Sequence, residues 1–260
     1  MKILITGYKG FIGQNMVNAL KDKHELSFYE LGDDPPELEG LDWCIHLGAN
    51  SSTTERNVEK IMRQNHDFSC MLLVACQLNG VNLQYASSAS VYGNTTDFKE
   101  DAPLYPASPY AWTKFLFDRN VLSQKFDGIV VQGFRYFNVY GPSEGHKGGQ
   151  ASPYYQFAKQ AMETGVIKLF EGSKNFYRDF VPVETVVDYH QKFFDVKESG
   201  IWNIGTGTPR SFEDIAREIA NQYGAEIKYI PMPEHIKSQY QSYTCADLTK
   251  LKATLSASNG

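Results

Sequence analysis

The sequence predicts an α/β protein with a doubly wound parallel sheet, followed by a second, smaller α/β region. Three observations support this class. Short apolar runs of β type alternate with longer helical patterns through the first half of the chain. A glycine-rich turn directly follows the first of these runs. After Asn138 the regular alternation stops, because glycine and proline breaks and aromatic residues become frequent.

Within the first 140 residues, five apolar runs have the length and composition of strands. They are Lys2 to Thr6, Leu26 to Glu30, Trp43 to Leu47, Leu83 to Tyr85 and Ile129 to Phe134. Helical patterns separate them at Phe11 to Lys21, Val58 to Asn79 (with a break) and Tyr110 to Lys125. Leu31 to Gly40 has the composition of a loop, which leaves little room for a further strand and helix before Trp43. We therefore expect a shortened nucleotide-binding domain in residues 1–140.

The remainder, residues 141–260, is predicted to be mainly a substrate-binding domain, with residues 179–205 crossing back to the first domain. Helices are expected at Pro153 to Thr164 and at Glu184 to Phe194. Ser211 and Asp214 have the spacing of a capping box, ahead of apolar residues that share one helix face: Ile215, Ala216, Ile219, Ala220 and Tyr223. A short strand is expected at Ile227 to Ile230, and Ser256 to Gly260 are expected to form a polar, frayed tail.

Composition excludes several classes of function. The 260 residues are 42% hydrophobic and 21% charged, as in ordinary globular proteins, and the net charge of -5 provides no basic stripe for nucleic acid. The apolar run at the N-terminus is too short for a secretory signal, and no segment approaches the length of a membrane span. Cysteines 44, 70, 76 and 245 lack CxxC spacing, so free thiols are favoured over disulfides or a metal site. These features indicate a reduced, cytoplasmic protein.

The glycine turn has the chemistry of a dinucleotide site. Gly7, Gly10 and Gly13 follow a strand and open a helix, where a bare backbone can approach a pyrophosphate at the helix N-terminus. Glu30 ends the second strand, and its carboxylate could accept the adenosine ribose hydroxyls. No arginine lies nearby to bind a 2′-phosphate, which favours NAD over NADP. An ordinary turn with a surface glutamate is the alternative interpretation.

Tyr110 and Lys114 form a candidate acid/base pair. Their four-residue spacing places both side chains on one helix face, where the ammonium group is expected to lower the pKa of the phenol. Ser87 to Ser90 follow another strand end, at the sheet edge where ligands gather, and a serine hydroxyl there could bind the reacting oxygen. A decorated helix and a polar turn are the alternatives for isolated matches of this kind.

Taken together, these motifs resemble a known family. Gly7-x-x-Gly10-x-x-Gly13, Ser87-Ser88-Ala89-x-Val91-Tyr92-Gly93 and Tyr110-x-x-x-Lys114 are similar to motifs of the extended short-chain dehydrogenase/reductases, which have a Rossmann-type fold and modify nucleotide sugars. More specific strings resemble the ADP-L-glycero-D-manno-heptose 6-epimerases: His46 to Glu55, Phe134 to Pro142, Glu144-Gly-His-Lys-Gly148, Leu169-Phe-Glu-Gly-Ser173 and Arg178-Asp-Phe-Val181.

The resemblance implies the following site residues. Catalytic roles would fall to Ser88, Tyr110, Lys114 and, as a second base, Lys147. NAD would contact Gly7, Gly10, Phe11, Ile12, Gly13, Glu30, Leu47, Gly48, Ala49, Asn65, Tyr110, Lys114 and Val139. The nucleotide sugar would contact Ser88, Asn138, His146, Phe170, Glu171, Gly172, Ser173, Arg178 and Tyr240, with Arg178 pairing with the diphosphate. Without the resemblance, Lys147 would be interpreted as a solvated loop lysine and Arg178 as a surface partner of Asp179.

The chain departs from the family at several points. Leu31 to Gly40 is shorter and lacks the lysines that assist NADP, Gly149 and Gln156 replace a serine and a histidine near the sugar, and the chain ends soon after Leu255, before the family's closing helix. Ala89 and Ser90 replace the acid and base of sugar dehydratases, which leaves epimerisation by transient oxidation and re-reduction at one carbon. We therefore expect an NAD-dependent, homo-oligomeric ADP-heptose 6-epimerase that acts on a nucleotide sugar. A UDP-sugar 4-epimerase, a related enzyme on another nucleotide sugar and a non-enzymatic NAD sensor or scaffold are the alternatives.

Overall fold

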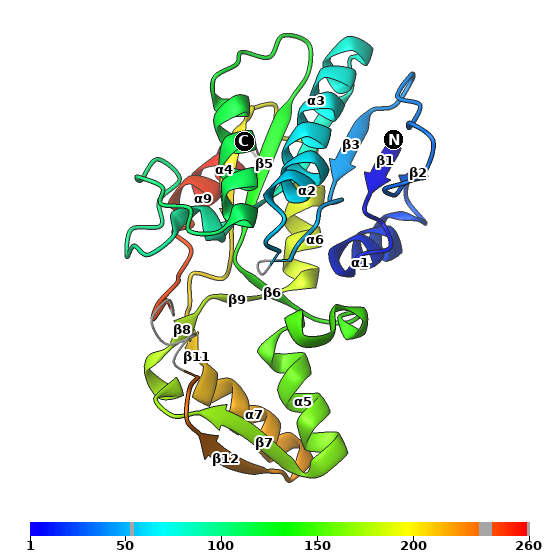
Figure 1. The fold of residues 1–260 in the computed structure, drawn as a ribbon. Helices are drawn as coiled ribbons and strands as arrows, with labels where there is room; N and C mark the ends of the chain where they lie inside the picture. Colours follow the sequence, from blue (N-terminus) through cyan, green and yellow to red (C-terminus); the bar gives the residue numbers. More distant parts are fainter. Residues whose placement is uncertain (53–54, 234–240, 259–260) are drawn as a thin grey trace.

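The protein has a larger lobe and a smaller lobe, joined by several crossings of the chain (Figure 1). The structure, a computed structural model, describes residues 1–52, 55–233 and 241–258. The larger lobe contains a six-stranded sheet with helices on both faces, and the smaller lobe contains two helices and short pairs of strands. None of the helices in these described residues is long and apolar enough to cross a membrane.

The central sheet is parallel and has the strand order β10-β5-β4-β3-β1-β2. Its strands are β1 (Lys2–Thr6), β2 (Glu25–Tyr29), β3 (Trp43–His46), β4 (Asn82–Ser88), β5 (Val131–Tyr136) and β10 (Gly200–Ile204). The chain moves outward from β1 to β2 and then in the opposite direction from β3 onward, so the switch point lies between β1 and β3. Ligands of such sheets bind at the carboxyl ends beside this point. The predicted α/β class is confirmed.

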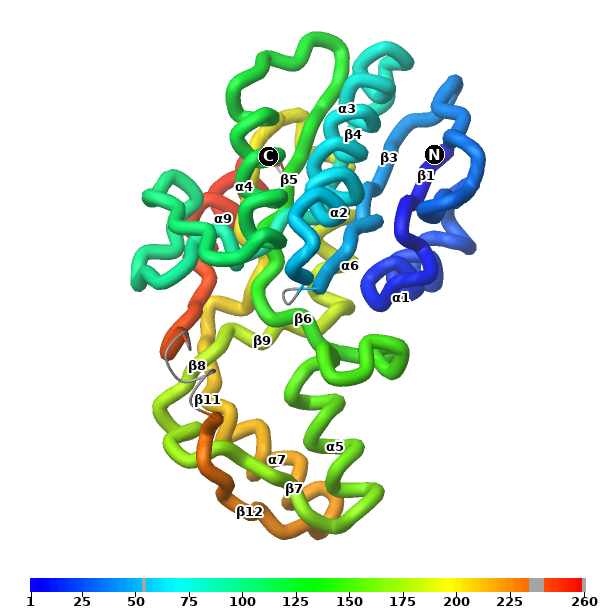
Figure 2. The backbone as a smooth tube through the Cα atoms, in the orientation of Figure 1, coloured from blue at the N-terminus to red at the C-terminus, as the bar shows by residue number. Residues whose placement is uncertain are grey.

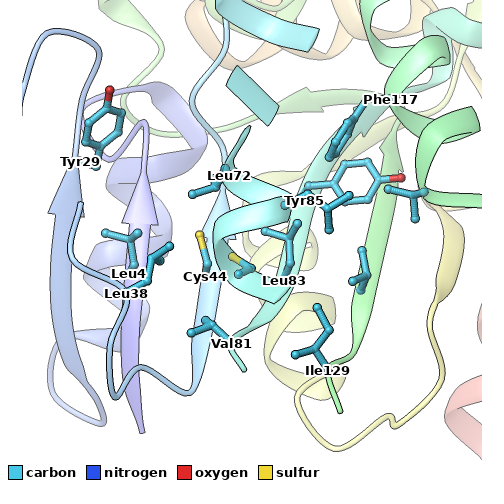
Figure 3. Packing of buried hydrophobic residues seen from close by; sticks show 14 residues of the cluster. Leu4, Tyr29, Leu38, Cys44, Leu72, Val81, Leu83, Tyr85, Phe117 and Ile129 are labelled. Atoms are coloured by element: carbon cyan, nitrogen blue, oxygen red, sulfur yellow. The ribbon is translucent and has the colours of Figure 1, made fainter. Parts of the chain in front are cut away.

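Helices cover both faces of the sheet. On one face lie α1 (Phe11–Leu20) and α6 (Val183–Lys192), and on the other lie α3 (Phe68–Asn79) and α4 (Pro109–Leu122). Figure 3 shows the core on the α3 and α4 face, where Cys44 and Leu83 of the sheet pack against Leu72 and Phe117 of the helices. All four cysteine thiols of the chain are free, and those of Cys44 and Cys76 are buried in this core.

The expected break within Val58 to Asn79 is a turn of π-helix. A short α2 (Val58–Ile61) leads into the π-helical segment η1 (Met62–Asp67), and α3 continues from Phe68. Single π turns inside helices often occur at functional sites, because they re-aim side chains. Here the turn carries Asn65, which is buried.

The connection from β2 to β3 contains no helix, as the loop composition of Leu31 to Gly40 predicted. Parallel strands usually need a helix in this position, both to return the chain and to cover the sheet. In this chain Leu38, which is 6% exposed, packs into the same core cluster as Leu4 and Leu72. A loop thus covers part of the sheet that a crossover helix would otherwise cover, and the chain reaches β3 through this loop (Figure 2).

The smaller lobe packs two helices on a pair of parallel strands. These elements are α5 (Pro153–Thr164), β7 (Val166–Phe170), α7 (Phe212–Tyr223) and β12 (Glu226–Ile230). The predicted capping box is present, since the Ser211 hydroxyl accepts from the backbone N–H of Asp214 and the Asp214 carboxylate accepts from the N–H of Ser211. Two short pairs join the lobes: β6 (Asn138–Tyr140) with β9 (Phe180–Pro182), and β8 (Tyr177–Arg178) with β11 (Arg210–Ser211).

Several elements differ from the sequence-based expectation. The short strands β6, β8, β9 and β11 and the longer strands β7 and β10 were not predicted, and the last described element is a helix, α9 (Thr249–Ser258). The expectation of a frayed tail from Ser256 is therefore wrong as far as Ser258. Helix α9 lies with the larger lobe, where Leu251 joins the core cluster of β10 and Trp202 Nε1 donates a hydrogen bond to Thr254 Oγ1 at 3.0 Å.

Candidate active site

The first turn after β1 brings bare backbone close to the loop after β3. Gly7 has φ +70°, and a Cβ at this position would lie 2.5 Å from the Gly48 Cα. A Cβ on Gly13 would lie 2.1 Å from the Gly7 carbonyl oxygen. The predicted glycines are thus required by close approach, and they leave the uncapped start of α1 at Phe11 exposed to a ligand.

A pocket of about 230 Å³ lies beside this turn. The described residues that line it are Thr6, Gly7, Tyr29, Glu30, Leu31, Gly48, Ala49, Asn50, Gln64 and Phe68. Glu30 stands directly after β2, and its Oε1 accepts a hydrogen bond from the Lys9 backbone N–H at 2.7 Å. This carboxylate at the rim, with the glycine backbone below it, fits the ribose and pyrophosphate of a dinucleotide.

A buried chain of hydrogen bonds supports the floor of this pocket. His46 Nδ1 lies 2.7 Å from Thr6 Oγ1, and His46 Nε2 lies 2.8 Å from Ser69 Oγ. Because the Ser69 hydroxyl donates to the Asn65 carbonyl, it must accept from Nε2–H, which leaves Nδ1 to accept from Thr6. Burial lowers the pKa of His46 to about 3, so the imidazole is neutral and structural.

Asn65 holds the loop that follows β3. Its Oδ1 accepts from the Asn50 N–H at 2.7 Å, and its Nδ2 donates to the Asn50 carbonyl at 3.0 Å and to Thr113 Oγ1 at 3.2 Å. The side chain therefore ties the π turn to the pocket loop and to α4. Leu47, at the start of this loop, packs into the two clusters under the sheet.

A larger pocket of about 480 Å³ adjoins the glycine turn. It brings together several predicted residues from separate elements, namely Phe11, Ile12, Ser88, Tyr110, Asn138, Val139 and Lys147. The sequence reasoning missed other residues of its lining: Ser51, Ser87, Tyr136, Phe137, Gln150, Ala151, Ser152 and Pro153. Their residue types are common throughout the chain. The signal that could have identified them is their position, at the ends of strands or in the loop after β6.

Tyr110 lies in the first turn of α4, whose start is set by local chemistry. Pro109 occupies the first helical turn, and the Ser108 hydroxyl accepts from the Ala111 N–H at 3.2 Å. Burial raises the pKa of Tyr110, while a hydrogen bond with the Ser88 hydroxyl lowers it. Ser88 Oγ also accepts from the Ser90 N–H at 3.2 Å, which fixes its orientation at the end of β4.

Lys114 lies one turn further along α4. Its Nζ donates to the Ala86 carbonyl at 2.9 Å and lies 5.9 Å from the centroid of the Tyr110 ring. Burial lowers the pKa of Lys114 to about 8, and the nearby Asp118 carboxylate raises it. The expectation that this lysine lowers the pKa of Tyr110 is not met in the structure: burial raises that pKa, and the group that lowers it is the Ser88 hydroxyl.

A buried ion pair holds α4 against the sheet. Asp118 Oδ2 accepts from Arg135 Nε at 2.9 Å, with both side chains at most 1% exposed. Asp118 Oδ1 accepts from the Tyr85 hydroxyl at 3.1 Å, and Arg135 Nη1 donates to the Tyr92 hydroxyl at 3.0 Å. This network connects α4 to β4, β5 and the loop after β4, and thereby positions Tyr110.

Lys147 enters the same pocket from the 3₁₀ turn η3 (Gly145–Gln150). Its Nζ lies 5.1 Å from the centroid of the Phe11 ring, at the start of α1. Burial lowers the pKa of Lys147, and the Glu144 carboxylate raises it. The neighbouring His146 is exposed.

The remaining predicted residues lie in the smaller lobe and do not line the described part of the Tyr110 pocket. Arg178 donates to the carbonyls of Tyr177 and Gln241, at 2.8 and 2.5 Å. Asp179 carries four other hydrogen bonds, from Thr206 (two), Gly207 and Ala246. Phe170, Glu171, Gly172 and Ser173 form the turn after β7, where Ser173 Oγ donates to the Phe170 carbonyl. Tyr240 lies outside the described residues.

Comparisons with known proteins bear on the family and the fold. A family model described as the NAD dependent epimerase/dehydratase family matches residues 33–205, more than half of the chain. The ADP-L-glycero-D-manno-heptose-6-epimerase of Helicobacter pylori is similar in structure, with a TM-score of 0.89 and 29% identity over 98% of this chain and 90% of that one. The UDP-glucose 4-epimerase of Thermus thermophilus, solved with NAD, has a TM-score of 0.79 and 25% identity over 100% and 99%. The UDP-N-acetylglucosamine 4-epimerase of Methanobrevibacter ruminantium shares the fold, with a TM-score of 0.88 and 22% identity over 98% and 91%.

Proposed function

This chain belongs to the NAD dependent epimerase/dehydratase family, and on that premise we propose that it is an isomerase that inverts one carbon of a nucleotide sugar. One observation carries the proposal: Ser88, Tyr110 and Lys147, from three separate elements, line a single pocket of about 480 Å³ beside the glycine turn. Burial raises the pKa of Tyr110 and lowers that of Lys147, and two titratable groups with shifted pKa values in one pocket favour acid/base chemistry over binding alone.

The cofactor assigned to the glycine turn is NAD. Gly7 and Gly13 let the turn pack closely where a Cβ would collide with Gly48 or with the Gly7 carbonyl oxygen, and this packing brings bare backbone to the start of α1. Glu30 provides an acceptor for ribose hydroxyls beside it. A 2′-phosphate beside the Glu30 carboxylate would place two negative charges together, which disfavours NADP. When bound, NAD supplies a reversible hydride acceptor for the carbon that is inverted.

The protein's own side chains move the protons. Tyr110 Oη takes the proton of the substrate hydroxyl, and Ser88 Oγ hydrogen-bonds the same oxygen. Burial lowers the pKa of Lys114 to about 8 and the Asp118 carboxylate opposes this shift, so at neutral pH the ammonium group one turn from Tyr110 can stabilise a phenolate as it forms. Lys147 Nζ, on the loop after β6, is the acid/base for the opposite face of the carbon. A second group on the other side is useful, because the hydride leaves one face of the carbon and returns to the opposite face.

The sugar we assign is ADP-glycero-manno-heptose, inverted at C6. The 29% identity to the Helicobacter pylori enzyme supports this choice, together with the Glu144-Gly-His-Lys string that carries Lys147. In this assignment Asn138 and His146 contact the sugar, Arg178 binds the diphosphate, and the turn from Phe170 to Ser173 and Tyr240 contact the nucleotide end.

The assay incubates the purified protein with one ADP-heptose epimer and resolves the two C6 epimers by chromatography. Interconversion without added reductant is expected. Tyr110→Phe should lose about 10²- to 10⁴-fold in kcat, the usual contribution of a general acid/base group. Tyr105→Phe is the matched control, since Tyr105 is 58% exposed and outside the pocket lining. Full turnover by Tyr110→Phe would refute the mechanism.

A UDP-sugar 4-epimerase is the second candidate. The sugar pocket lacks a side chain at Gly149, and Gln156 Nε2 donates to the Gly148 carbonyl at 2.6 Å. That side chain is thereby engaged within the loop. Turnover of UDP-galactose with no turnover of ADP-heptose would replace the C6 reaction by a C4 reaction and leave the roles of Tyr110 and Lys147 in place. Binding of NAD without turnover of either sugar would indicate the sensor or scaffold instead.

A further inference from the structure

The loop that carries Lys147 is closed at its neck by a single buried carboxylate. Glu144 is 1% exposed, although most of the residues from 142 to 150 around it in the loop 141–152 are exposed. Its Oε1 accepts from the Gly141 N–H at 2.9 Å and from Ser152 Oγ at 2.8 Å, and its Oε2 accepts from the Ser152 N–H at 2.6 Å. One side chain thus binds the first and the last residue of the loop.

Glu144 also sets the start of the turn from which Lys147 projects. The Lys147 N–H donates to the Glu144 carbonyl at 2.9 Å and closes the first turn of η3. The preceding residue, Ser143, has φ +74°, the only positive φ of a residue other than glycine in the described ranges. A strained backbone of this kind persists only where surrounding bonds determine it, and the Glu144 carboxylate provides those bonds on both sides.

Further contacts hold the closed loop against the cofactor side of the pocket. Asn15 Nδ2 of α1 donates to the Pro142 carbonyl at 2.9 Å, and Gln150 Nε2 donates to Ser52 Oγ at 3.1 Å. Lys147 Nζ lies over the Phe11 ring. The loop therefore packs on α1 and on the segment after β3. Its two ends, Gly141 and Ser152, are held together by the Glu144 carboxylate.

We propose that Glu144 is the positioning residue for Lys147: its carboxylate closes the loop neck and so fixes where the ammonium group enters the pocket. The role rests on the proposed function, because Lys147 is the second acid/base only in that mechanism. A displacement of a reacting group by about 1 Å can cost about 10²-fold in rate. The carboxylate therefore affects turnover without contacting substrate.

Glu144→Gln is the test substitution, because it keeps the shape and removes one acceptor. In one amide orientation the NH₂ group faces the Ser152 N–H, and in the other it faces the Gly141 N–H, so one donor at the neck always meets a donor. Glu163→Gln is the matched control, since the Glu163 side chain is 61% exposed and its ion pair with Lys159 is long, at 3.9 Å.

Turnover is measured for the NAD-loaded protein with ADP-heptose in a double-mutant cycle. Glu144→Gln and Lys147→Met should each lower kcat by about 10- to 100-fold, and the double variant should lie within about threefold of Lys147→Met, because both changes remove one function. Equal turnover of Glu144→Gln and wild type, or losses that multiply in the double variant, would overturn the role of Glu144. Wild-type turnover by Lys147→Met would instead refute the proposed function of that lysine, and with it the inference.

Amide hydrogen exchange provides a readout that does not depend on substrate. In Glu144→Gln the peptide spanning residues 141–152 should exchange about tenfold faster or more, while the β4 peptide keeps its protection. Unchanged exchange of the loop peptide would contradict the role of the carboxylate at the neck. If Glu144→Gln does not fold, Ser152→Ala removes one of the three donors, and Ser211→Ala removes a similar cap from α7 as its control. Only Ser152→Ala should then lower kcat.

Discussion

Replacing Asp118 by asparagine should destabilise the protein strongly, because it breaks a buried ion pair from one side. Asp118 is fully buried, and its carboxylate accepts from Arg135 Nε at 2.9 Å and from the Tyr85 hydroxyl at 3.1 Å. In Asp118→Asn the amide can still accept from Tyr85. Its NH₂ group then faces the Arg135 N–H, and the guanidinium loses its counter-charge in a site without solvent.

The expected cost follows from this burial. Removing one partner of a buried pair costs about 3–5 kcal/mol, because the remaining charge is uncompensated. For a chain of this size each kcal/mol lowers Tm by about 2–4 °C, so Tm should fall by roughly 6–20 °C. Glu213→Gln is the control, since the Glu213–Arg217 pair lies at i,i+4 and its arginine is 61% exposed. That change should cost about 0.3–0.5 kcal/mol and shift Tm by at most about 2 °C.

The measurement is thermal unfolding followed by circular dichroism, with urea titration for the free energy of unfolding. Asp118→Leu combined with Arg135→Met should recover part of the loss, because the pair is then replaced by apolar side chains of similar volume. Since Asp118 also raises the pKa of Lys114, the asparagine variant should bring that pKa below about 8. The reasoning is refuted if Asp118→Asn shifts Tm no more than Glu213→Gln.

Two further changes test other parts of the structure. Gly13→Ala should weaken NAD binding by about tenfold or more in a thermal-shift titration, because its Cβ would lie 2.1 Å from the Gly7 oxygen; Gly149→Ala, with open space around it, should not. Burial lowers the pKa of His46 and of His190 to about 3, whereas both have a pKa of about 6.5 in the unfolded chain. Between these two pKa values the unfolded state binds protons at both histidines and the folded state does not, so stability falls as pH drops below about 6.5. Stability should therefore drop by about 2–3 kcal/mol between pH 7.5 and 5.5 in urea titrations, and His190→Gln should roughly halve this contribution.

Features with local signals were predicted well from the sequence. The glycine turn, the α5 range and the capping box of α7 each depend on residues within a few positions, so spacing and residue type suffice. The same holds for the missing crossover helix, because Leu31 to Gly40 contains the residues of a loop and few of a helix. Local chemistry determined these elements, and tertiary packing did not override it.

Features that depend on distant residues were not predicted. Strand β10 is a short apolar run that becomes a strand by pairing with β5, and the two segments are far apart in sequence. The π turn at Asn65 was expected only as a break, since its hydrogen-bond pattern leaves no distinct trace in residue types. Strand β7 likewise depends on β12, which follows it after two further crossings of the chain.

The site shows the same division. The resemblance named Ser88, Tyr110 and Lys147, which the structure places in one pocket, but the pKa of Tyr110 depends on a burial that no sequence pattern reveals. Glu144 belongs to the Glu144-Gly-His-Lys-Gly148 motif. From sequence alone, a buried glutamate that accepts hydrogen bonds here looks the same as a solvated loop glutamate. Its three donors lie three and eight positions away, and only the folded loop brings them to one carboxylate.

Strand β10 is synthesised long after β5, the strand with which it pairs, and this order has a consequence for folding on the ribosome. Strand β5 ends at Tyr136 and its outer neighbour β10 begins at Gly200, so the 63 residues 137–199 lie between them. At about 5–20 residues per second, the unpaired edge of β5 is without its partner for roughly 3–13 s. The whole of β5 is buried in the finished fold, so this interval exposes a run of core side chains and backbone donors together. Nascent chains that stall between these two strands would therefore expose β5 as an unpaired edge strand, which can pair with strands of other chains. Chaperone binding to this edge would matter most while residues 137–199 are translated.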